Sequence, residues 1–354
     1  MTTNQLPKTG DGVQRIDTYA DWMARQRVPI LGGHYLDDLN KVELAQWDWL
    51  GGRGALIDFI GSERTTGSFV AEILPGKSLN PQRHLYEQDV YILSGRGATT
   101  VWQEDGTKVS FEWQAGSLFS TPLNAAYQMH NGSGDTPARF VAVHTMPLLL
   151  MYFRDEDFIF KNPYRFTTRF DGEAAYFADE GKVIGHRLLE TNFVPDAVNL
   201  KLISMEERGG RGNNITFELG GNTFGCHISD FAPGNYKKVH RHGGGAHIII
   251  LAGEGYSLMW PDEDPWVKVD WKPGAFFSPP DVWWHQHFNY SLEPARYLAF
   301  RWGSNKYRMP RLFQPDERLG AGGRTQIEYE EENPEVRRLF DSSRVEWLAR
   351  NNKG

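Results

Sequence analysis

The sequence has little cysteine: Cys226 is the one cysteine in 354 residues, which excludes an internal disulfide and a Cys-rich zinc module. No apolar run approaches the ~18 residues that a membrane helix needs. The start, MTTNQLPKTGDGVQRID, has no charged segment followed by an apolar one, as a secretion signal would have. The net charge of −7 argues against a nucleic-acid-binding surface. These absences predict a soluble cytoplasmic protein that binds neither membrane nor nucleic acid.

Glycine, proline and aromatic residues, in contrast, are plentiful. The chain has 37 glycines, 19 prolines and 13% aromatic side chains. So many aromatic side chains argue against disorder, and the glycines and prolines indicate many turns between short strands. At ~100–200 residues per domain, the length corresponds to roughly two domains.

The chain repeats itself at an offset of 158 positions. Pro75 and Gly76 correspond to Pro233 and Gly234, and the offset continues without a gap as far as Asn131 and Asn289. The matched pairs in between are His84 and His242, Gly95 and Gly253, Gly97 and Gly255, Trp102 and Trp260, Trp113 and Trp271, Gly116 and Gly274, and Pro122 and Pro280. Two copies at so long a period indicate a duplicated domain rather than a solenoid.

Each copy has the pattern of β-structure. In the second copy, the apolar runs of AHIIILAGEGYSLMW are separated by a glycine turn, WVKVDW alternates with period 2, and ARYLAFRW is typical of another strand. Helical patterns are confined to the segment DTYADWMARQ, which has an aspartate in N-cap position, and to PEVRRLFDSSRVEWLARN near the end. The sequence therefore predicts an all-β protein, a barrel or sandwich, with helical N- and C-terminal extensions.

Five of the eleven histidines fall between His240 and His287. His240 and His242 are two residues apart, and so are His285 and His287. Residues two apart on a strand point to the same face of a sheet, so these imidazoles converge if that face lines the inside of a barrel.

These spacings resemble the two motifs of the cupin superfamily. The second copy has Gly234-x5-His240-x-His242 and then Gly253, followed by Gly274-x5-Pro280-x4-His285-x3-Asn289. The resemblance implies two tandem cupin barrels, which are double-stranded β-helices of the jelly-roll type, and it implies that His240, His242 and His285 are metal ligands. The sequence departs from the family at the slot where a glutamate usually stands, because Ala246 occupies it.

Within the superfamily, the strings HRHGGGAHIIILAGEG and WWHQHFN look most like the metal-binding half of gentisate 1,2-dioxygenase and 1-hydroxy-2-naphthoate dioxygenase. Those bicupins hold iron with three histidines and no carboxylate. In gentisate dioxygenases the iron usually lies in the N-terminal barrel, whereas here the intact motif lies in the C-terminal one.

The resemblance implies a division of the chain into five parts. These are an N-terminal extension at 1–65, barrel 1 at 66–150, a linker at 151–205, barrel 2 at 206–303, and a C-terminal arm with a helix at 304–354.

Barrel 1 is expected to bind no metal. Gln82 stands where His240 stands in barrel 2, and Tyr127 stands where His285 stands, so that only His84 remains of the three. A single imidazole does not hold a first-row metal tightly. Glu87 and His130 could rescue a site, although neither occupies a ligand slot.

Three neutral ligands leave the charge of a divalent metal uncompensated, which favours an anionic substrate. They also leave open positions on the metal, as catalytic sites do and closed structural sites do not. The resemblance then implies an Fe(II)-dependent dioxygenase that uses O2 to cleave the ring of a hydroxylated aromatic acid of the gentisate, salicylate or hydroxynaphthoate type. Mn, Ni or Zn are the other possible metals. Two alternatives stay open: a metal-dependent cupin enzyme that does not use O2, such as an isomerase, decarboxylase or hydrolase, and a non-enzymatic bicupin that binds a small molecule.

Other residues have possible roles around the metal. His287 is predicted to be catalytic rather than a ligand, because it lies roughly 6.6 Å further along the strand than His285. Trp283 and Arg301 are predicted to bind the substrate, as an aromatic wall and as a carboxylate clamp. His247 is a possible fourth ligand, although the spacing to Gly253 argues against it. Cys226 is expected to be inert, and the protein to be a homodimer or homotetramer.

Overall fold

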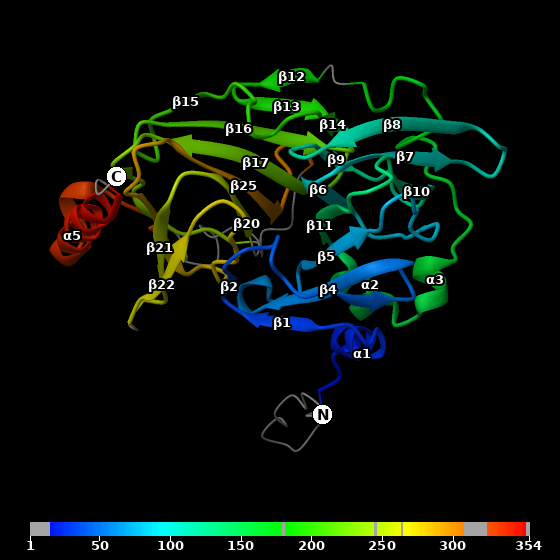
Figure 1. Ribbon diagram of the computed structural model, residues 1–354, viewed down its shortest axis with the longest axis horizontal. Helices are drawn as coiled ribbons and strands as arrows, with labels where there is room; N and C mark the ends of the chain where they lie inside the picture. Colours follow the sequence, from blue (N-terminus) through cyan, green and yellow to red (C-terminus); the bar gives the residue numbers. More distant parts are fainter. Residues whose placement is uncertain (1–14, 179–180, 244–245, 263–264, 308–323, 352–354) are drawn as a thin grey trace.

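The computed structural model describes residues 15–178, 181–243, 246–262, 265–307 and 324–351. It confirms the all-β fold: two jelly rolls of similar topology lie side by side, and the helices lie at the periphery (Figure 1). Each jelly roll consists of a large sheet and a small sheet, and we keep the names barrel 1 and barrel 2 for them.

The large sheet of barrel 1 has the strand order β1-β4-β5-β11-β6-β9-β14, with β3 paired to β4, and its small sheet has the order β10-β7-β8. The strands are β1 (Ile30–Gly33), β3 (Ala45–Trp47), β4 (Gly52–Phe59), β5 (Gly67–Ile73), β6 (Gln88–Ser94), β7 (Arg96–Trp102), β8 (Lys108–Gln114), β9 (Leu118–Ser120), β10 (Ala126–Asn131), β11 (Ala138–His144) and β14 (Phe193–Val194).

The large sheet of barrel 2 has the order β12-β13-β16-β17-β25-β20-β23-β2, with β15 paired to β16, and its small sheet has the order β22-β21-β24-β19-β26, with β18 paired to β24. The strands are β2 (Tyr35–Leu36), β12 (Lys182–Gly185), β13 (Leu188–Thr191), β15 (Ile203–Met205), β16 (Gly212–Leu219), β17 (Phe224–Phe231), β18 (Asn235–Tyr236), β19 (Val239–His240), β20 (His247–Ala252), β21 (Gly255–Trp260), β22 (Val267–Trp271), β23 (Phe276–Phe277), β24 (Trp284–Asn289), β25 (Ala295–Trp302) and β26 (Gln326–Ile327).

The two barrels exchange short edge strands. β2, which precedes barrel 1 in the chain, pairs with β23 of barrel 2, and β14, which precedes barrel 2, pairs with β9 of barrel 1. One backbone hydrogen bond follows each exchanged strand: Leu39 N–H donates to the Gly274 carbonyl at 2.8 Å, and Ala197 N–H donates to the Gly116 carbonyl at 2.9 Å. The donors are 158 residues apart, and so are the acceptors. The duplication therefore extends beyond the part visible in the sequence, and the divisions at 65 and 205 cut across shared sheets.

Two helices lie in the terminal segments where the sequence predicts them, and two more lie where barrel 1 meets the linker. They are α1 (Thr18–Arg25), α2 (Met146–Phe153), α3 (Glu156–Phe160) and α5 (Pro334–Asn351), with 3-10 turns at Ile60–Ser62 and Tyr329–Glu331. The carboxylate of Asp17 caps α1 by accepting from two backbone N–H groups. Among the described residues, no helix is both long and apolar enough to cross a membrane.

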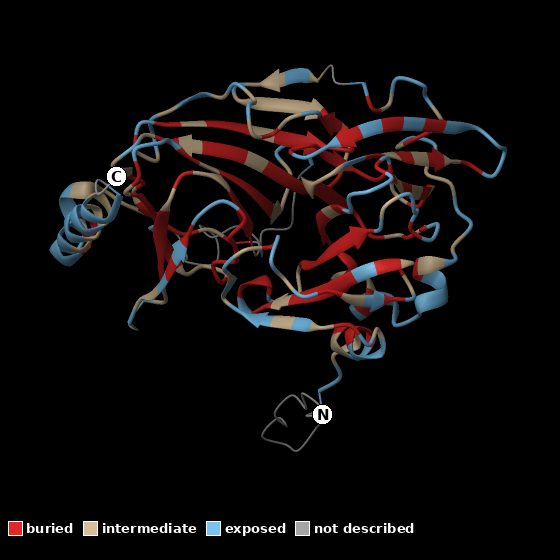
Figure 2. Ribbon diagram, viewed as in Figure 1, coloured by how far each residue is buried: buried red, intermediate tan, exposed pale blue. Residues whose placement is uncertain are grey.

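The central strands of the large sheets, such as β5 and β17, are buried on both faces (Figure 2). In β5, Phe69 and Ala71 face the inside of barrel 1, while Val70 between them packs in a second cluster with Phe217 and Leu298 of barrel 2. The apolar cluster between the two large sheets fixes the barrels against each other, because separating them would expose it to water. Cys226 lies in this cluster, where burial raises the pKa of its thiol, in keeping with an inert role.

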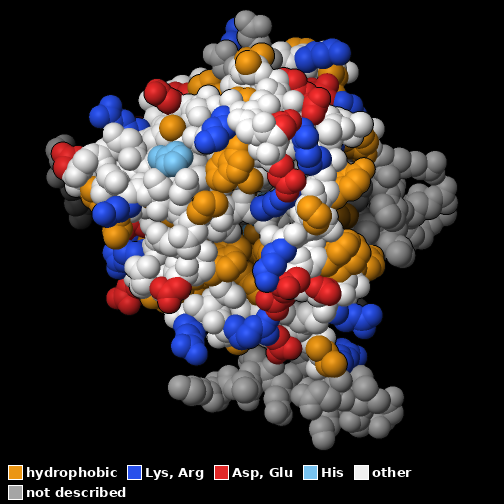
Figure 3. Space-filling model, turned by 90° about the vertical axis from the view of Figure 1, so that its right-hand side faces the viewer, with side chains coloured by type: hydrophobic (Ala, Val, Ile, Leu, Met, Phe, Trp, Pro, Cys, Tyr) orange, Lys and Arg blue, Asp and Glu red, His pale blue; other side chains and the backbone are white. Residues whose placement is uncertain are grey.

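The end of the molecule formed by barrel 1 is mixed in character. Figure 3 shows side chains of both charges interspersed with hydrophobic ones on this face. The exposed apolar side chains of α2 and α3 are Met151, Tyr152, Phe153 and Phe158. Nothing in the fold ties this surface to the histidine motif, which belongs to barrel 2.

Candidate metal centre

Three of the predicted ligands come together inside barrel 2. β19 and β24 are antiparallel neighbours in which His240 pairs with His285, and His242 follows at the end of β19. The ring centroid of His285 lies 4.3 Å from that of His240 and 4.8 Å from that of His242. One potential ligand atom from each residue lies within 4.8 Å of the other two. In the described part of the chain, this is the one such group of three histidine, cysteine or acidic residues.

Backbone carbonyls set the orientation of all three imidazoles. The Nδ1 atoms of His240, His242 and His285 lie 2.9, 3.2 and 3.1 Å from the carbonyl oxygens of Lys238, Gly243 and Trp283. A carbonyl only accepts hydrogen bonds, so each Nδ1 must carry the proton and each Nε2 keeps its lone pair. This tautomer is the one that binds a metal through Nε2, with the Nδ1–H groups held by a second layer of acceptors. The donor set therefore fits a divalent metal.

Burial keeps these imidazoles neutral. Desolvation, helped by the charges of neighbouring side chains, lowers the pKa of His240 and of His242 well below the ordinary value. Burial lowers the pKa of His285 to about 4. Neutral imidazole is the form that binds metal, so the site is preorganised near neutral pH.

The triad opens into a small cavity of about 210 Å³. Its lining is rich in polar groups and contains three cations, but no described aspartate or glutamate. The lining residues are Met205, Arg208, Asn214, Thr216, His227, Ser229, Lys237, His240, His242, Ala246, Ile248, His285, His287, Tyr297, Ala299 and Arg301. After burial itself, the charges of Arg301, Lys237 and Arg208 are what lower the pKa of His227, so the three cations act on the same wall of the cavity.

His287 lies beside the triad but is held differently. Its ring centroid is 5.7 Å from that of His285, and it does not belong to the group of potential ligand atoms. Its Nδ1 lies 2.7 Å from the hydroxyl of Ser257, which accepts a hydrogen bond from the indole N–H of Trp271 at 3.0 Å. The Ser257 proton is then free to bond to Nδ1 of His287, which leaves the ring proton on Nε2. Burial lowers the pKa of His287 well below its ordinary value, so the ring is neutral and, unlike the triad, offers a hydrogen-bond donor at Nε2.

The other candidates from the sequence separate into two groups. Arg301 lines the cavity. Trp283 is absent from the described lining residues and packs against His34, with ring centroids 5.8 Å apart. Trp283 precedes β24, which begins at Trp284, and its neighbour Val282 has a positive φ of 55°. Alternation of faces applies only within a strand.

His247 also points away from the triad. It begins β20, and its Nδ1 lies 3.3 Å from the hydroxyl of Thr66 in barrel 1. Its ring packs near Phe59 and Phe276. Ala246, at the slot where the family has a glutamate, lines the cavity instead. A one-residue shift moves a side chain to the opposite face of a strand, so His247 does not serve as a fourth ligand.

Sequence reasoning missed two of the three cations. Arg208 follows β15 and Lys237 lies between β18 and β19, so neither belongs to a strand whose alternation would reveal its direction. His227 on β17 was missed as well, although its parity in that strand matches Ser229, which also lines the cavity.

In barrel 1 the remaining histidine has no lone pair to offer. His84 directs Nδ1 to the Tyr86 carbonyl at 2.8 Å, and its Nε2 lies 3.1 Å from the hydroxyl of Tyr127. The side-chain amide of Gln88 donates to the same hydroxyl at 3.0 Å, so the Tyr127 proton is directed at Nε2 of His84. Tyr127, which stands at the position of the third ligand, therefore engages the Nε2 atom of His84 that a metal would need.

The two residues that could have rescued a site in barrel 1 are engaged elsewhere. Glu87 accepts hydrogen bonds from the backbone N–H groups of Thr223 and Phe224 at the start of β17. His130 lies against the hydroxyl of Ser78, with 2.7 Å between Nδ1 and Oγ.

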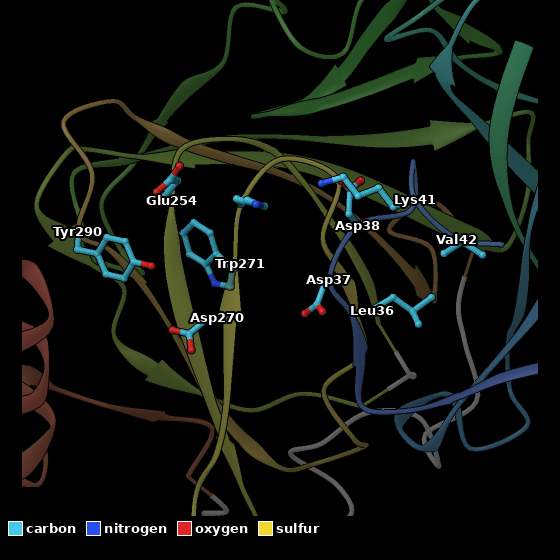
Figure 4. A pocket seen from close by; sticks show the side chains of 10 residues that line it. Leu36, Asp37, Asp38, Lys41, Val42, Glu254, Asp270, Trp271 and Tyr290 are labelled. Carbon is cyan, nitrogen blue, oxygen red and sulfur yellow. The ribbon is translucent and has the colours of Figure 1, made fainter. Parts of the chain in front are cut away.

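A larger groove of about 640 Å³ lies outside barrel 2, between β22 and the segment that follows β2 (Figure 4). It is lined by the acidic residues Asp37, Asp38, Glu254 and Asp270. Three of them are already engaged: Asp38 by Asn40 and Lys41, Glu254 by the indole of Trp347, and Asp270 by Lys268. Three of the four carboxylates in this groove are therefore already satisfied within the protein.

Comparisons with protein-family models and with curated sequences find no match. Among solved structures, the oxalate decarboxylase of Lactobacillus farciminis in complex with formate is similar, with a TM-score of 0.50 and 12% identity over 76% of this chain and 86% of that one. A variant of the Bacillus subtilis oxalate decarboxylase has a TM-score of 0.51 and 14% identity over 82% of this chain and 85% of that one. Mn(II) centres are named for the Bacillus subtilis enzyme. These likenesses establish the bicupin fold; they do not support the finer resemblance to gentisate dioxygenases.

Proposed function

We propose that this bicupin is a metal-dependent enzyme that acts on a small carboxylic acid without using O2, most simply as a decarboxylase. The observation that carries the proposal is the composition of the cavity: three histidines prepared to bind a metal, three cations and no described acidic side chain. Such a cavity selects an anion, because an anion is the one ligand that compensates its charge. The similarity of fold to oxalate decarboxylases supports this choice over ring cleavage.

The size of the cavity supports a small substrate. About 210 Å³ lies below the roughly 300–1,000 Å³ of pockets for drug-sized ligands. Tyr297 is the one phenylalanine, tyrosine or tryptophan residue among the described lining residues, and Trp283 does not line the cavity. A hydroxynaphthoate is thus a poor fit, and a short carboxylate is a good one.

A divalent metal bound by His240, His242 and His285 would supply Lewis-acid polarisation of a carboxylate oxygen. Imidazole ligands suit iron, and the Mn(II) centres of the Bacillus subtilis oxalate decarboxylase support manganese. We therefore propose Mn(II) or Fe(II) as the metal.

The protein's own groups can perform the rest of a decarboxylation. The guanidinium groups of Arg208 and Arg301 bind and orient the carboxylate that reacts. The bond between the carboxylate carbon and its neighbour breaks, CO2 leaves, and its bonding electrons take up a proton at the carbon left behind. Burial holds the pKa of His287 well below its ordinary value, so the ring is neutral, and it can deliver that proton from Nε2 only while Nδ1 takes up another one, drawn from solvent through the Ser257 hydroxyl. The reaction balances without an oxidant or a reductant.

A dioxygenase that acts on a small hydroxylated aromatic acid is the second candidate. The triad without a carboxylate, with Ala246 in the glutamate slot, favours it.

The deciding experiment loads purified protein with Mn(II) or Fe(II) and measures CO2 release and O2 uptake in parallel. The panel contains short carboxylates, including oxalate, and hydroxybenzoates, each with and without air. We expect metal-dependent CO2 release that persists without O2 and is lost in His285→Ala. Stoichiometric O2 uptake with a hydroxybenzoate would replace our proposal by the second candidate, and metal-free protein as active as loaded protein would overturn both.

A further inference from the structure

Lys237 is a buried cation without an acidic partner. The residue is only 2% exposed, and none of the ion pairs in the described residues includes it. Its ammonium nitrogen lies 2.9 Å from the hydroxyl of Ser229 and 3.0 Å from that of Tyr297, and it lies 4.8 Å from the centre of the Tyr297 ring. An ammonium has three protons to donate, and two neutral hydroxyls take two of them. One donor and the full charge therefore remain to be satisfied in the cavity.

Hydrogen bonds hold the backbone of Lys237 against the strand that carries two of the cavity histidines. The N–H of Lys237 donates to the carbonyl of His287 at 3.0 Å, and the Lys237 carbonyl accepts from the side chain of Gln286 at 2.9 Å. Lys237 is thus attached to β24, the strand that carries His285 and His287. Any ligand of the triad has the ammonium at a defined place beside it, without a loop that must close.

Tyr297 adds a second donor at the same place. Its hydroxyl oxygen accepts from Lys237, and no acceptor for its own proton is found in the part of the chain that the structure describes. Because Tyr297 and Lys237 both line the cavity, the ammonium and the hydroxyl form a pair of donors. Such a pair matches the two oxygens of one carboxylate group.

Among the described residues, the other two cations of the cavity form no ion pair either. Arg208 donates to the side-chain oxygen of Gln326, a neutral acceptor, at 2.9 Å. Arg301 has no hydrogen bond or ion pair within the described ranges, and the carboxylate of Glu218 nearby is taken up by Ser304 and two backbone N–H groups. A ligand with a single negative charge would leave most of this charge uncompensated.

We propose that Lys237, assisted by Tyr297, binds a second anionic group of the substrate and so makes the enzyme selective for dicarboxylates over monocarboxylates. One carboxylate lies at the histidine triad, and the other accepts hydrogen bonds from Nζ of Lys237 and the hydroxyl of Tyr297. The inference rests on the proposed function in that it takes the substrate to be a carboxylic acid.

The test compares matched pairs of ligands on Mn(II)-loaded protein by titration calorimetry: malonate against acetate, and succinate against propionate. In Lys237→Met we expect the affinity for each dicarboxylate to fall by about tenfold or more, as for the loss of a charge-assisted hydrogen bond. The affinity for each monocarboxylate should stay within about threefold. Lys237→Arg should retain part of the preference because it keeps the charge.

The adjacent lysine provides a matched control. Lys238 pairs with Glu328 and does not line the cavity, so Lys238→Met should leave both series unchanged. Metal content and melting temperature of each variant separate loss of binding from loss of folding. If Lys237→Met binds both series as the wild type does, or loses both equally, the proposal is overturned. The same holds if the wild type does not prefer the dicarboxylates.

These outcomes are distinct from those of the turnover experiment. Dicarboxylate binding that depends on Lys237, without any CO2 release, would overturn the proposed reaction and leave the role of Lys237 standing. CO2 release from carboxylates with no dependence of binding on Lys237 would do the reverse.

Discussion

Replacing His287 with Gln should remove turnover while leaving the metal centre intact. In the structure, Nδ1 of His287 is 2.7 Å from the hydroxyl of Ser257, and its Nε2 carries the proton. The amide oxygen of glutamine can accept the same hydrogen bond from Ser257, whereas its NH2 group does not transfer a proton near neutral pH. The variant therefore isolates proton delivery from packing.

The magnitude follows from the role. A positioned general acid contributes about 10²–10⁴-fold to the rate, so kcat should fall by that factor. His287→Ala, in contrast, would also leave the Ser257 hydroxyl without its partner, at a cost of about 1–3 kcal/mol in the free energy of unfolding. A comparison of the two variants separates the catalytic effect from the structural one.

The assay is CO2 release under saturating substrate, combined with metal analysis and thermal unfolding of the same preparations. We expect His287→Gln to bind as much metal as the wild type and to melt within a few degrees of it. Loss of metal would make His287 a ligand. A rate within a few-fold of the wild type, measured on folded protein, would show that His287 only supports the barrel wall. Ser257→Ala serves as the control that perturbs the orientation of the His287 ring without removing the ring. Its rate should lie between those of the wild type and His287→Gln.

Four further results are expected. The wild type should contain about one metal per chain, and His285→Ala, which removes one of three ligands, should lose most of it in elemental analysis. Equal metal content in the variant and the wild type, or two metals per wild-type chain, would contradict the assignment. Adding the metal at about 100 times its Kd should stabilise the apo-protein by about 2.7 kcal/mol in urea unfolding, and this effect should vanish in the same variant. Burial lowers the pKa of His84 to about 4 from its usual value of 6.5, so the unfolded state binds more protons than the folded state between these two pH values. The free energy of unfolding should therefore be largest above pH 6.5, and this group should lower it by about 3 kcal/mol as the pH drops to 4. In His84→Gln the free energy of unfolding should depend less steeply on pH. Light scattering should find a homodimer or homotetramer rather than a 40.4 kDa monomer, a proposal that follows from the usual symmetry of such proteins.

The sequence determined the features that depend on local spacing. The repeat of glycines, prolines and tryptophans predicted two similar β-domains, because turns and strand ends recur at matched positions in both copies. The resemblance to the cupin motifs identified His240, His242 and His285, which the structure brings together. The N-cap at Asp17 was likewise readable from its neighbours.

Only the tertiary structure decided what surrounds the metal. Arg208 and Lys237 reach the cavity from irregular segments, where no alternation applies, and the exchange of β2 and β14 between the barrels depends on pairings far apart in the sequence. Trp283 is not among the described residues that line the cavity, because it precedes β24, where the alternation of faces does not apply. The distinction between His287 and the triad depends on whether Nδ1 meets a hydroxyl or a backbone carbonyl, and those partners come together only when the strands pack. Side-chain direction is a local property of a strand, whereas the charge and hydrogen bonding of a cavity are set by all the segments that meet there.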